Sequence, residues 1–390
     1  MTNIWRRALA LLVAVVAATG VTTASAAERL VVGPAGVPLT LQQALDKARD
    51  GDVIDILPGE YRGPPVVLEQ RRLTLRGVGT RPVFNAERKL GSARAIWTVK
   101  GGEVVIQNIE FRGARAQDAG GAGVRQDGGV LLLRDCVFYD NEHGVLALNN
   151  DTATLTIENT QFGLAPRTVG GLPHLLNVGR IGKLSITGSR FQQGFEGHMI
   201  KSRARESFIG YNFIHDGNTG GGSYEIDLPV GGVATVIGNL IGQSPRGQNR
   251  VMLAYGAEGR AWERNVLYVA HNTFVNNMLT PAWFMRVWRD KLPEGTEVVA
   301  INNLLVGSGV FWLGASGQFQ GNRPATQGML MDTATHAFEL PPGSVWRGSG
   351  VDPRQVSGQD LSPKAEFNWP MGAKPLSGER SSWSPGAFQK

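Results

Sequence analysis

The stretches Ile106–Phe111 (IQNIEF), Leu133–Phe138 (LRDCVF), Ile157–Phe162 (IENTQF) and Ile186–Phe191 (ITGSRF) are copies of one short apolar phrase. Weaker copies follow, and successive copies end 23 to 33 residues apart. The weaker copies end at Ile214, Ile241, Phe274 and Leu305. A repeat of this length is typical of a solenoid whose coils stack on one another, not of a globule with one central core.

The segments beside the phrases read as short strands. Leu131–Leu133, Leu155–Ile157 and Leu184–Ile186 alternate or run apolar, as strands of a stacked parallel sheet do. The chain holds 52 glycines in 390 residues and only 18% charged residues, which suits many tight turns between buried strands. We therefore predict an all-β parallel solenoid over residues 53–309.

The first residues resemble a secretory signal in composition. Arg6 and Arg7 precede the apolar run Ala8–Ala18, and Ala24–Ala26 (ASA) offers a small-x-small cleavage site. We predict a signal peptide over residues 1–26, cleavage after Ala26 and a secreted or periplasmic protein. The apolar run is short for a membrane span, so we expect no membrane association after cleavage. An uncleaved anchor is the alternative.

Both ends of the solenoid need covering, because an open end exposes core and strand edges. Thr40–Ala48 has the apolar spacing of an amphipathic helix, and Thr40 with Gln43 forms a capping-box pattern. We predict an N-terminal cap over residues 27–52. Residues 310–390 lose the repeat, and we predict an irregular segment that packs on the outside and caps the other end. A separate folded domain is the alternative.

One position of the phrase is repeatedly asparagine. Asn212, Asn239, Asn272 and Asn303 share it, and stacked side-chain amides can hydrogen bond from coil to coil. We interpret these residues as structural. Cys136 is the only cysteine, so no disulfide can form within the chain.

The net charge of +6 favours an anionic partner. We expect no nucleic-acid partner, because no Lys/Arg run with interleaved aromatic residues occurs. We also expect a monomer.

The stretches Thr40–Leu45 (TLQQAL), Gly51–Ile54 (GDVI) and Leu57–Tyr61 (LPGEY) resemble the opening of secreted right-handed parallel β-helix proteins of the pectin-lyase-like superfamily. Ser384–Phe388 (SPGAF) resembles an ending that bacterial members share. The nearest pattern is that of the alginate-lyase and chondroitinase-B type of polysaccharide lyase. The resemblance implies an acidic polysaccharide substrate, a catalytic Lys and Arg on neighbouring coils, and a calcium site built from Asn and Glu.

Polar residues concentrate on one predicted face. If Leu176, Ile200 and Ile226 point inward, period two places Asn177, Lys201 and Asp227 outward in one column. Met199 and Glu225 then fall in the next outward column. This face is the predicted site.

The functional interpretation is β-elimination on a uronic-acid polymer. Lys201, crowded by Arg203, would act as base, and Arg203 or Arg205 would hold the substrate carboxylate. Tyr224 or His198 would serve as acid or relay.

Two further groups complete the predicted site. His215 lies at the root of the glycine-rich loop 217–222 and is predicted to contact substrate. Trp283, Arg286 and Trp288 form an aromatic-basic loop on which sugar rings can stack, unless its tryptophans are buried.

The neutralising cation could instead be calcium, bound by Asn177, Glu225 and Asp227.

Three alternatives stay open. The outward charges can form a cross-rung ion-pair ladder without chemistry. Glu225 and Asp227 can act as the paired carboxylates of a glycoside hydrolase. The same face can also hold sugar in a non-catalytic binding protein.

Overall fold

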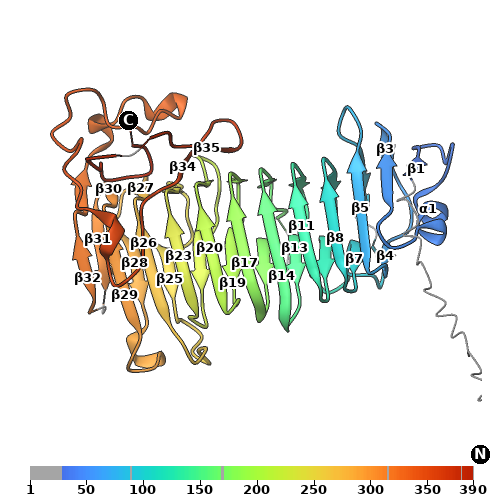
Figure 1. Ribbon diagram of the computed structural model, residues 1–390, viewed down its shortest axis with the longest axis horizontal. Coiled ribbons are helices and arrows are strands. Elements are labelled where there is room, and N and C mark those ends of the chain that lie inside the picture. Colours follow the sequence, from blue (N-terminus) through green and yellow to red (C-terminus); the bar gives the residue numbers. More distant parts are fainter. Residues whose placement is uncertain (1–28, 88–89, 168–170, 314–315, 379, 390) are drawn as a thin grey trace, which may run out of the picture.

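The structure is a computed structural model that describes residues 29–87, 90–167, 171–313, 316–378 and 380–389. The predicted signal peptide lies outside the described residues. Short strands wind into an elongated stack of coils, and each coil adds one strand to each of three parallel sheets (Figure 1). The all-β parallel β-helix predicted from the repeat is confirmed.

The three sheets follow one another around each coil, and we call them sheets A, B and C. Sheet A contains β1 (Arg29–Val32), β2 (Val53–Ile56), β5 (Arg72–Gly77), β8 (Glu103–Gln107), β11 (Val130–Arg134), β14 (Asn150–Glu158), β17 (Ile181–Thr187), β20 (Glu206–Gly210), β23 (Val233–Ile237), β26 (Val266–Ala270), β29 (Glu297–Ile301) and β32 (Gln318–Gln320). Sheet B contains β3 (Glu60–Tyr61), β6 (Val83–Asn85), β9 (Glu110–Arg112), β12 (Val137–Tyr139), β15 (Gln161–Gly163), β18 (Arg190–Phe191), β21 (Phe213–His215), β24 (Leu240–Gln243), β27 (Thr273–Asn276), β30 (Leu304–Val306) and β33 (Arg323–Ala325). Sheet C contains β4 (Val66–Leu68), β7 (Ala95–Val99), β10 (Ala122–Gln126), β13 (His143–Ala147), β16 (His174–Val178), β19 (Ile200–Ser202), β22 (Ile226–Leu228), β25 (Val251–Tyr255), β28 (Ala282–Val287) and β31 (Gly309–Leu313).

The apolar phrase is the corner that joins sheet A to sheet B. Its last residue points into the core, where the rings of Phe111, Phe138, Phe162 and Phe191 stack with centroids 5.3, 4.9 and 4.6 Å apart. Offset aromatic stacking adds to the burial of these rings. The apolar phrase therefore repeats because each coil adds one ring to this buried column.

The third residue of the phrase has a positive φ angle in coil after coil. Asn108, Asp135 and Asn159 have φ of 54°, 55° and 48°, and Gly188 has φ of 58°. Asn, Asp and Gly tolerate this left-handed conformation better than other residues. This conformation explains why they recur at the third position of the phrase.

A side-chain ladder runs along the same corner. Asn212, Asn239, Asn272, Asn303 and Asn322 are linked by side-chain amide hydrogen bonds of 2.9, 3.0, 3.0 and 2.9 Å. The predicted asparagine ladder is confirmed, and it is longer by one coil.

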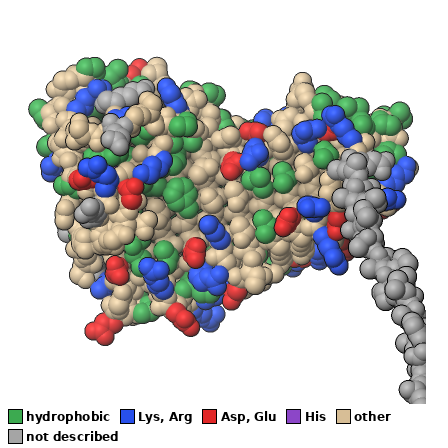
Figure 2. All heavy atoms as spheres, in the orientation of Figure 1, with side chains coloured by type: hydrophobic (Ala, Val, Ile, Leu, Met, Phe, Trp, Pro, Cys, Tyr) green, Lys and Arg blue, Asp and Glu red, His purple; other side chains and the backbone are tan. Residues whose placement is uncertain are grey.

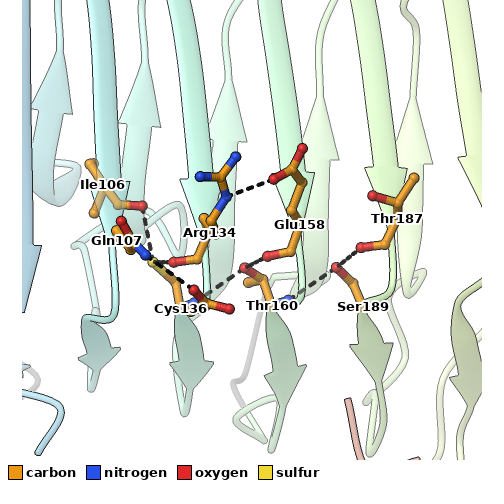
Figure 3. A network of polar contacts seen from close by, with 9 residues as sticks. Ile106, Gln107, Arg134, Cys136, Glu158, Thr160, Thr187 and Ser189 are labelled. Carbon is orange, nitrogen blue, oxygen red and sulfur yellow. Dashed lines mark hydrogen bonds and ion pairs between the residues drawn. The ribbon is translucent and has the colours of Figure 1, made fainter. Parts of the chain in front are cut away.

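Hydroxyl groups continue this ladder towards the N-terminus (Figure 3). The Ser189 amide donates to Asn212 Oδ1 at 2.9 Å, the Thr160 amide to Ser189 Oγ at 3.1 Å and the Cys136 amide to Thr160 Oγ1 at 3.3 Å. Cys136 is buried as a free thiol at the end of this series.

The N-terminal end is closed by α1 (Leu41–Lys47), whose Leu41, Ala44 and Leu45 face the core. The predicted capping box is present, since the Gln43 amide donates to Thr40 Oγ1 and the Thr40 amide donates to Gln43 Oε1. β1 pairs with β2, so the segment predicted as cap also supplies a strand of sheet A.

The coils extend beyond residue 309, because β31 to β33 continue all three sheets to Ala325. The rest of the chain carries the 3-10 helices η2 (Gln327–Met329), η3 (Thr333–Thr335) and η4 (Pro353–Gln355) and the antiparallel pair β34 (Ala365–Phe367) and β35 (Ala373–Pro375). In Figure 1 this segment lies across several coils near the C-terminal end.

The C-terminal segment covers the outward faces of sheets A and B. Val356 and Leu361 pack in one buried apolar cluster with Tyr268 of sheet A. Phe338 packs in another with Leu240 and Val275 of sheet B. Within the described residues, neither cluster includes a residue of sheet C, and the polar face predicted from the sequence lies on that sheet.

Candidate active site

The strand register of sheet C brings the predicted column together. Asn177 pairs with Lys201 and Lys201 with Asp227 on successive coils, which are about 4.8 Å apart in a parallel sheet. Ile200 and Ile226, which flank this column, are buried in the core. Lys201 therefore points out of the solenoid, as predicted.

Lys201 is held by two carboxylates. Its Nζ lies 3.1 Å from Asp227 Oδ2 and 3.0 Å from Glu258 Oε1. Only 12% of the Lys201 side chain and 3% of the Asp227 side chain are exposed, so these charges meet in a largely desolvated place. Arg203 lies next to Lys201, because both cations contact Glu258 Oε1. The Arg203 guanidinium binds Glu258 through two hydrogen bonds of 2.8 and 2.7 Å.

Glu258 was missed by the sequence analysis. It lies in the loop that follows β25, the strand of sheet C next to Asp227. Its amide donates to Pro229 O at 2.9 Å, and Lys291 Nζ donates to Ala257 O at 2.7 Å. These contacts fix the loop so that the Glu258 carboxylate bridges two cations. In the sequence, Glu258 comes shortly after a strand of the predicted face. It lies in a loop outside the repeat, however, so the repeat could not show that it lies next to Lys201.

The two carboxylates have opposite pKa shifts. Burial raises the pKa of Asp227 to about 6, although the neighbouring Lys201 acts in the other direction. Asp227 Oδ1 is buried and accepts no hydrogen bond within the described residues. Partial burial opposes ionisation of Glu258, but hydrogen bonds from Arg203 and Lys201 outweigh it and lower its pKa to about 2.

A ladder of rings stands beside the Lys201 column. The rings of His174, His198 and Tyr224 stack in parallel, with centroids 5.0 and 4.7 Å apart. The His198 amide donates to His174 Nδ1 at 2.8 Å and the Tyr224 amide to His198 Nδ1 at 3.2 Å. An imidazole whose Nδ1 accepts carries its proton on Nε2 when neutral.

His198 connects this ladder to the charged cluster. Its Nε2 lies 3.4 Å from Asp227 Oδ2. Burial, followed by the charge of Lys201, lowers the pKa of His198 to about 3, so the ring is neutral near pH 7. Tyr224 is half-buried, and burial, followed by the charge of Asp227, raises the pKa of its phenol. Both residues predicted for proton transfer thus lie on the Lys201 face, and both are neutral there.

Arg286 continues the column towards the C-terminus. It pairs with Ala254, which pairs with Asp227, so only a methyl group stands between the two charged residues. The Arg286 guanidinium lies 4.4 Å from the Trp283 ring centre and 4.5 Å from that of Trp288. Both tryptophans are half-buried. The predicted aromatic-basic group therefore lies on the same face as Lys201.

Glu225 is not part of this face, and the predicted calcium ligands do not come together. Residues at its register position, among them Met199 and Met252, belong to the core, so the predicted outward column of Met199 and Glu225 is wrong. Burial, followed by the charge of Asp216, raises the pKa of Glu225 well above its usual range. Asn177 and Asp227 face outward, so the three residues do not fit one ion. Among the described residues, no group of three or more His, Cys, Asp or Glu side chains is placed to hold a metal.

Two predicted substrate contacts lie elsewhere. His215 belongs to β21 of sheet B and is buried by the C-terminal segment, with its ring 5.7 Å from that of Phe338. Burial lowers the pKa of His215 to about 4. Arg205 lies at the corner between sheets C and A, beside Trp262. The prediction that His215 contacts substrate at the Lys201 site is therefore wrong, because another part of the chain covers it.

Comparison with known proteins defines the class of the fold. No protein-family description and no curated protein sequence matches the chain. Among solved structures, it resembles pectate lyase Pel9A with a TM-score of 0.68 and 14% identity, over 94% of this chain and 97% of that one. It also resembles an alginate lyase from Paenibacillus sp. str. FPU-7 with a TM-score of 0.51 and 16% identity, over 77% of this chain and 98% of the other. The chain thus has the pectin-lyase-like parallel β-helix fold.

Within the described residues, no helix has the length and apolar character that crossing a membrane requires.

Proposed function

We propose that the protein is a polysaccharide lyase that cleaves a uronic-acid polymer by β-elimination on the outward face of sheet C. One observation carries the proposal. Lys201 and Arg203 present two cations around a single carboxylate, that of Glu258, which is the arrangement that a sugar carboxylate requires. The solved structures that share this fold include a pectate lyase and an alginate lyase.

Elimination requires neutralisation of the sugar carboxylate, removal of the proton at C5 and protonation of the leaving oxygen. In this proposal Arg203 pairs with the carboxylate, and Lys201 Nζ accepts the C5 proton. The electron pair of that C–H bond forms the double bond to C4 as the C4–O bond breaks. Tyr224 donates its phenolic proton to the departing oxygen.

Asp227 prepares Lys201 for this role. A lysine that acts as base must first lose its own proton, and Asp227 Oδ2 lies 3.1 Å from its Nζ. Because burial raises the pKa of Asp227 to about 6, this carboxylate is better able to take up that proton than an ordinary surface aspartate. His198 Nε2 lies 3.4 Å from the same oxygen of Asp227 and helps to orient this carboxylate.

The test is turnover by the Lys201→Ala variant on pectate and alginate. A lyase forms an unsaturated sugar that absorbs in the near ultraviolet, and we expect this signal from the wild type but not from the variant. Binding of the polymer should persist in the variant. Lys364→Ala removes an exposed lysine of the C-terminal segment and serves as the matched control. Turnover that survives in Lys201→Ala would remove Lys201 from the mechanism.

A second candidate is a glycoside hydrolase that uses Asp227 and Glu258. Both carboxylates contact Lys201 Nζ, and their pKa values lie on opposite sides of the ordinary range. Such a divergence is typical of an acid and a nucleophile or base in one site. This pair replaces Glu225 and Asp227, since Glu225 is buried in the core. New reducing ends without near-ultraviolet absorption would favour the hydrolase.

A further inference from the structure

We infer that a hollow at the corner between sheets C and A, next to Arg203, is a second binding site for the carboxylates of an acidic polysaccharide. The inference rests on the substrate class proposed above. The hollow has a volume of about 450 Å³. Its charged and aromatic lining residues are Arg180, Arg205, Glu206, Trp262, Glu263 and Arg264. In Figure 2, charged side chains gather along the lower edge of the solenoid, where Figure 1 shows the loops that enter sheet A.

Loops from separate coils build this hollow. Arg180 and Arg205 directly precede β17 and β20, whereas Trp262 and Arg264 belong to the long loop between β25 and β26. Arg180 Nη1 donates to Arg260 O of that loop at 2.8 Å, across 80 positions of the chain. The loop therefore lies back over earlier coils and closes one side of the hollow.

Trp262 orders the cations of the hollow. The Arg180 guanidinium lies 3.8 Å from the centre of the Trp262 ring, and that of Arg205 lies 5.9 Å from it. The indole Nε1 donates to Arg203 O at 3.1 Å. Stacking on an indole holds a guanidinium in place without using its hydrogen-bond donors. Trp262 thus orients two arginines and ties them to the strand end that carries Arg203.

The guanidinium groups of Arg205 and Arg264 are available to a ligand. Within the described part of the chain, none of Arg180, Arg205 and Arg264 forms an ion pair with a carboxylate, although Glu206 and Glu263 line the same hollow. Arg205 and Arg264 are exposed. Arg203, in contrast, is bound by Glu258. An arginine with free donors on a preorganised support is suited to bidentate capture of a carboxylate.

The position of the hollow relates it to the candidate active site. Arg203 directs its side chain to the Lys201 cluster and its carbonyl to Trp262, so the hollow begins where that cluster ends. A polymer that carries a carboxylate on successive sugars can contact both. The expected consequence is tighter binding of long substrates, with little effect on the chemical step.

The test is binding of pectate and alginate to an Arg205→Gln/Arg264→Gln double variant, measured by calorimetry at low ionic strength. We expect a Kd about tenfold higher than that of the wild type, with kcat retained. The matched control is Arg49→Gln/Arg71→Gln, which removes the same charge from exposed arginines near the N-terminal end of the stack. Unchanged affinity in the Arg205/Arg264 variant, or an equal loss in the control, would overturn the inference.

The experiments distinguish failure of the second binding site from failure of the proposed lyase function. If the wild type binds pectate or alginate through Arg205 and Arg264 but releases no unsaturated product, the hollow stands and the lyase assignment fails. If product forms and the double variant binds normally, the lyase stands and the hollow fails. Inorganic phosphate is a further probe. Phosphate could bind through Arg205 and Arg264 while the double variant keeps its affinity for the polymer. The hollow would then be a site for small anions, and the inference would be overturned.

Discussion

At the scale of single residues, Glu258 occupies the place that a substrate carboxylate would take in the proposed mechanism. Its carboxylate accepts two hydrogen bonds from Arg203 and one contact from Lys201, as a uronate carboxylate would. It is the most exposed member of this group, with 39% of its side chain accessible. A substrate carboxylate can therefore compete with Glu258 for Arg203, whereas Asp227 stays buried beneath Lys201.

In the proposed mechanism, Asp227 sets the pH dependence of activity. Its pKa is raised to about 6, so Asp227 is mainly protonated below that pH and cannot take a proton from Lys201. We expect kcat/KM to fall as the pH drops through about 6, and we expect the Asp227→Asn variant to have low activity without this transition. The measurement is a kcat/KM profile between about pH 5 and 8. A wild-type profile that is flat across this range would contradict the assignment.

The same group has the opposite effect on stability. Because the pKa of Asp227 is higher in the folded protein than its ordinary value of 3.8, the unfolded chain releases this proton first. Its contribution therefore lowers the free energy of unfolding as the pH rises from about 4 to about 6. Urea unfolding over this range, with Asp227→Asn as the reference, isolates the contribution.

At the scale of elements, the sequence predicted what the coil repeats. The phrase, the asparagine ladder and the outward position of Lys201 follow from a pattern that recurs in each coil. Glu225 was predicted to face outward but is buried, because the chain bends before β22. Glu225 and Ile226 are both buried there, as are Leu175 and Leu176 two coils earlier, so strict alternation fails. Glu258 lies in a loop, where no period fixes a position.

The bend before β22 also removes one of the three predicted calcium ligands, Glu225. With Glu225 in the core, Asn177 and Asp227 are too few oxygen ligands for calcium, which takes six to eight. We expect dialysis against a chelator to leave turnover and the unfolding temperature unchanged. Activity that is lost on chelation and restored by calcium would contradict this expectation.

The asparagine ladder is the element that we expect to be most sensitive to substitution. Asn239 is fully buried, and its side chain accepts from the Asn212 amide groups and donates to Ile209 O and Asn272 Oδ1. Asn239→Ala leaves these buried groups unpaired, and we expect a loss of about 2–4 kcal/mol in the free energy of unfolding. The control is Asn218→Ala, at an exposed position of the glycine-rich loop 217–222. Similar urea midpoints for the two variants would refute the structural role of the ladder.

At the scale of the whole molecule, the C-terminal segment and the candidate site lie on different sheets of the solenoid. The segment buries outward apolar residues of sheets A and B, including Tyr268 and Val275, and the candidate site lies on sheet C. This division explains why His215 was misplaced by the sequence analysis. The residue lies at a strand end, as a site residue would, but a segment without any repeat covers it.

Phe338 tests whether the segment is structural. Its ring is buried against Phe213 and His215 of sheet B. We expect Phe338→Ala to lower the stability of the segment by about 3–5 kcal/mol through lost burial and a residual cavity. Limited proteolysis should then cut within residues 326–389 faster than in the wild type, while kcat at 25 °C is retained because the Lys201 cluster lies on another sheet. A fall in kcat without faster proteolysis would instead connect this segment to the chemistry on sheet C.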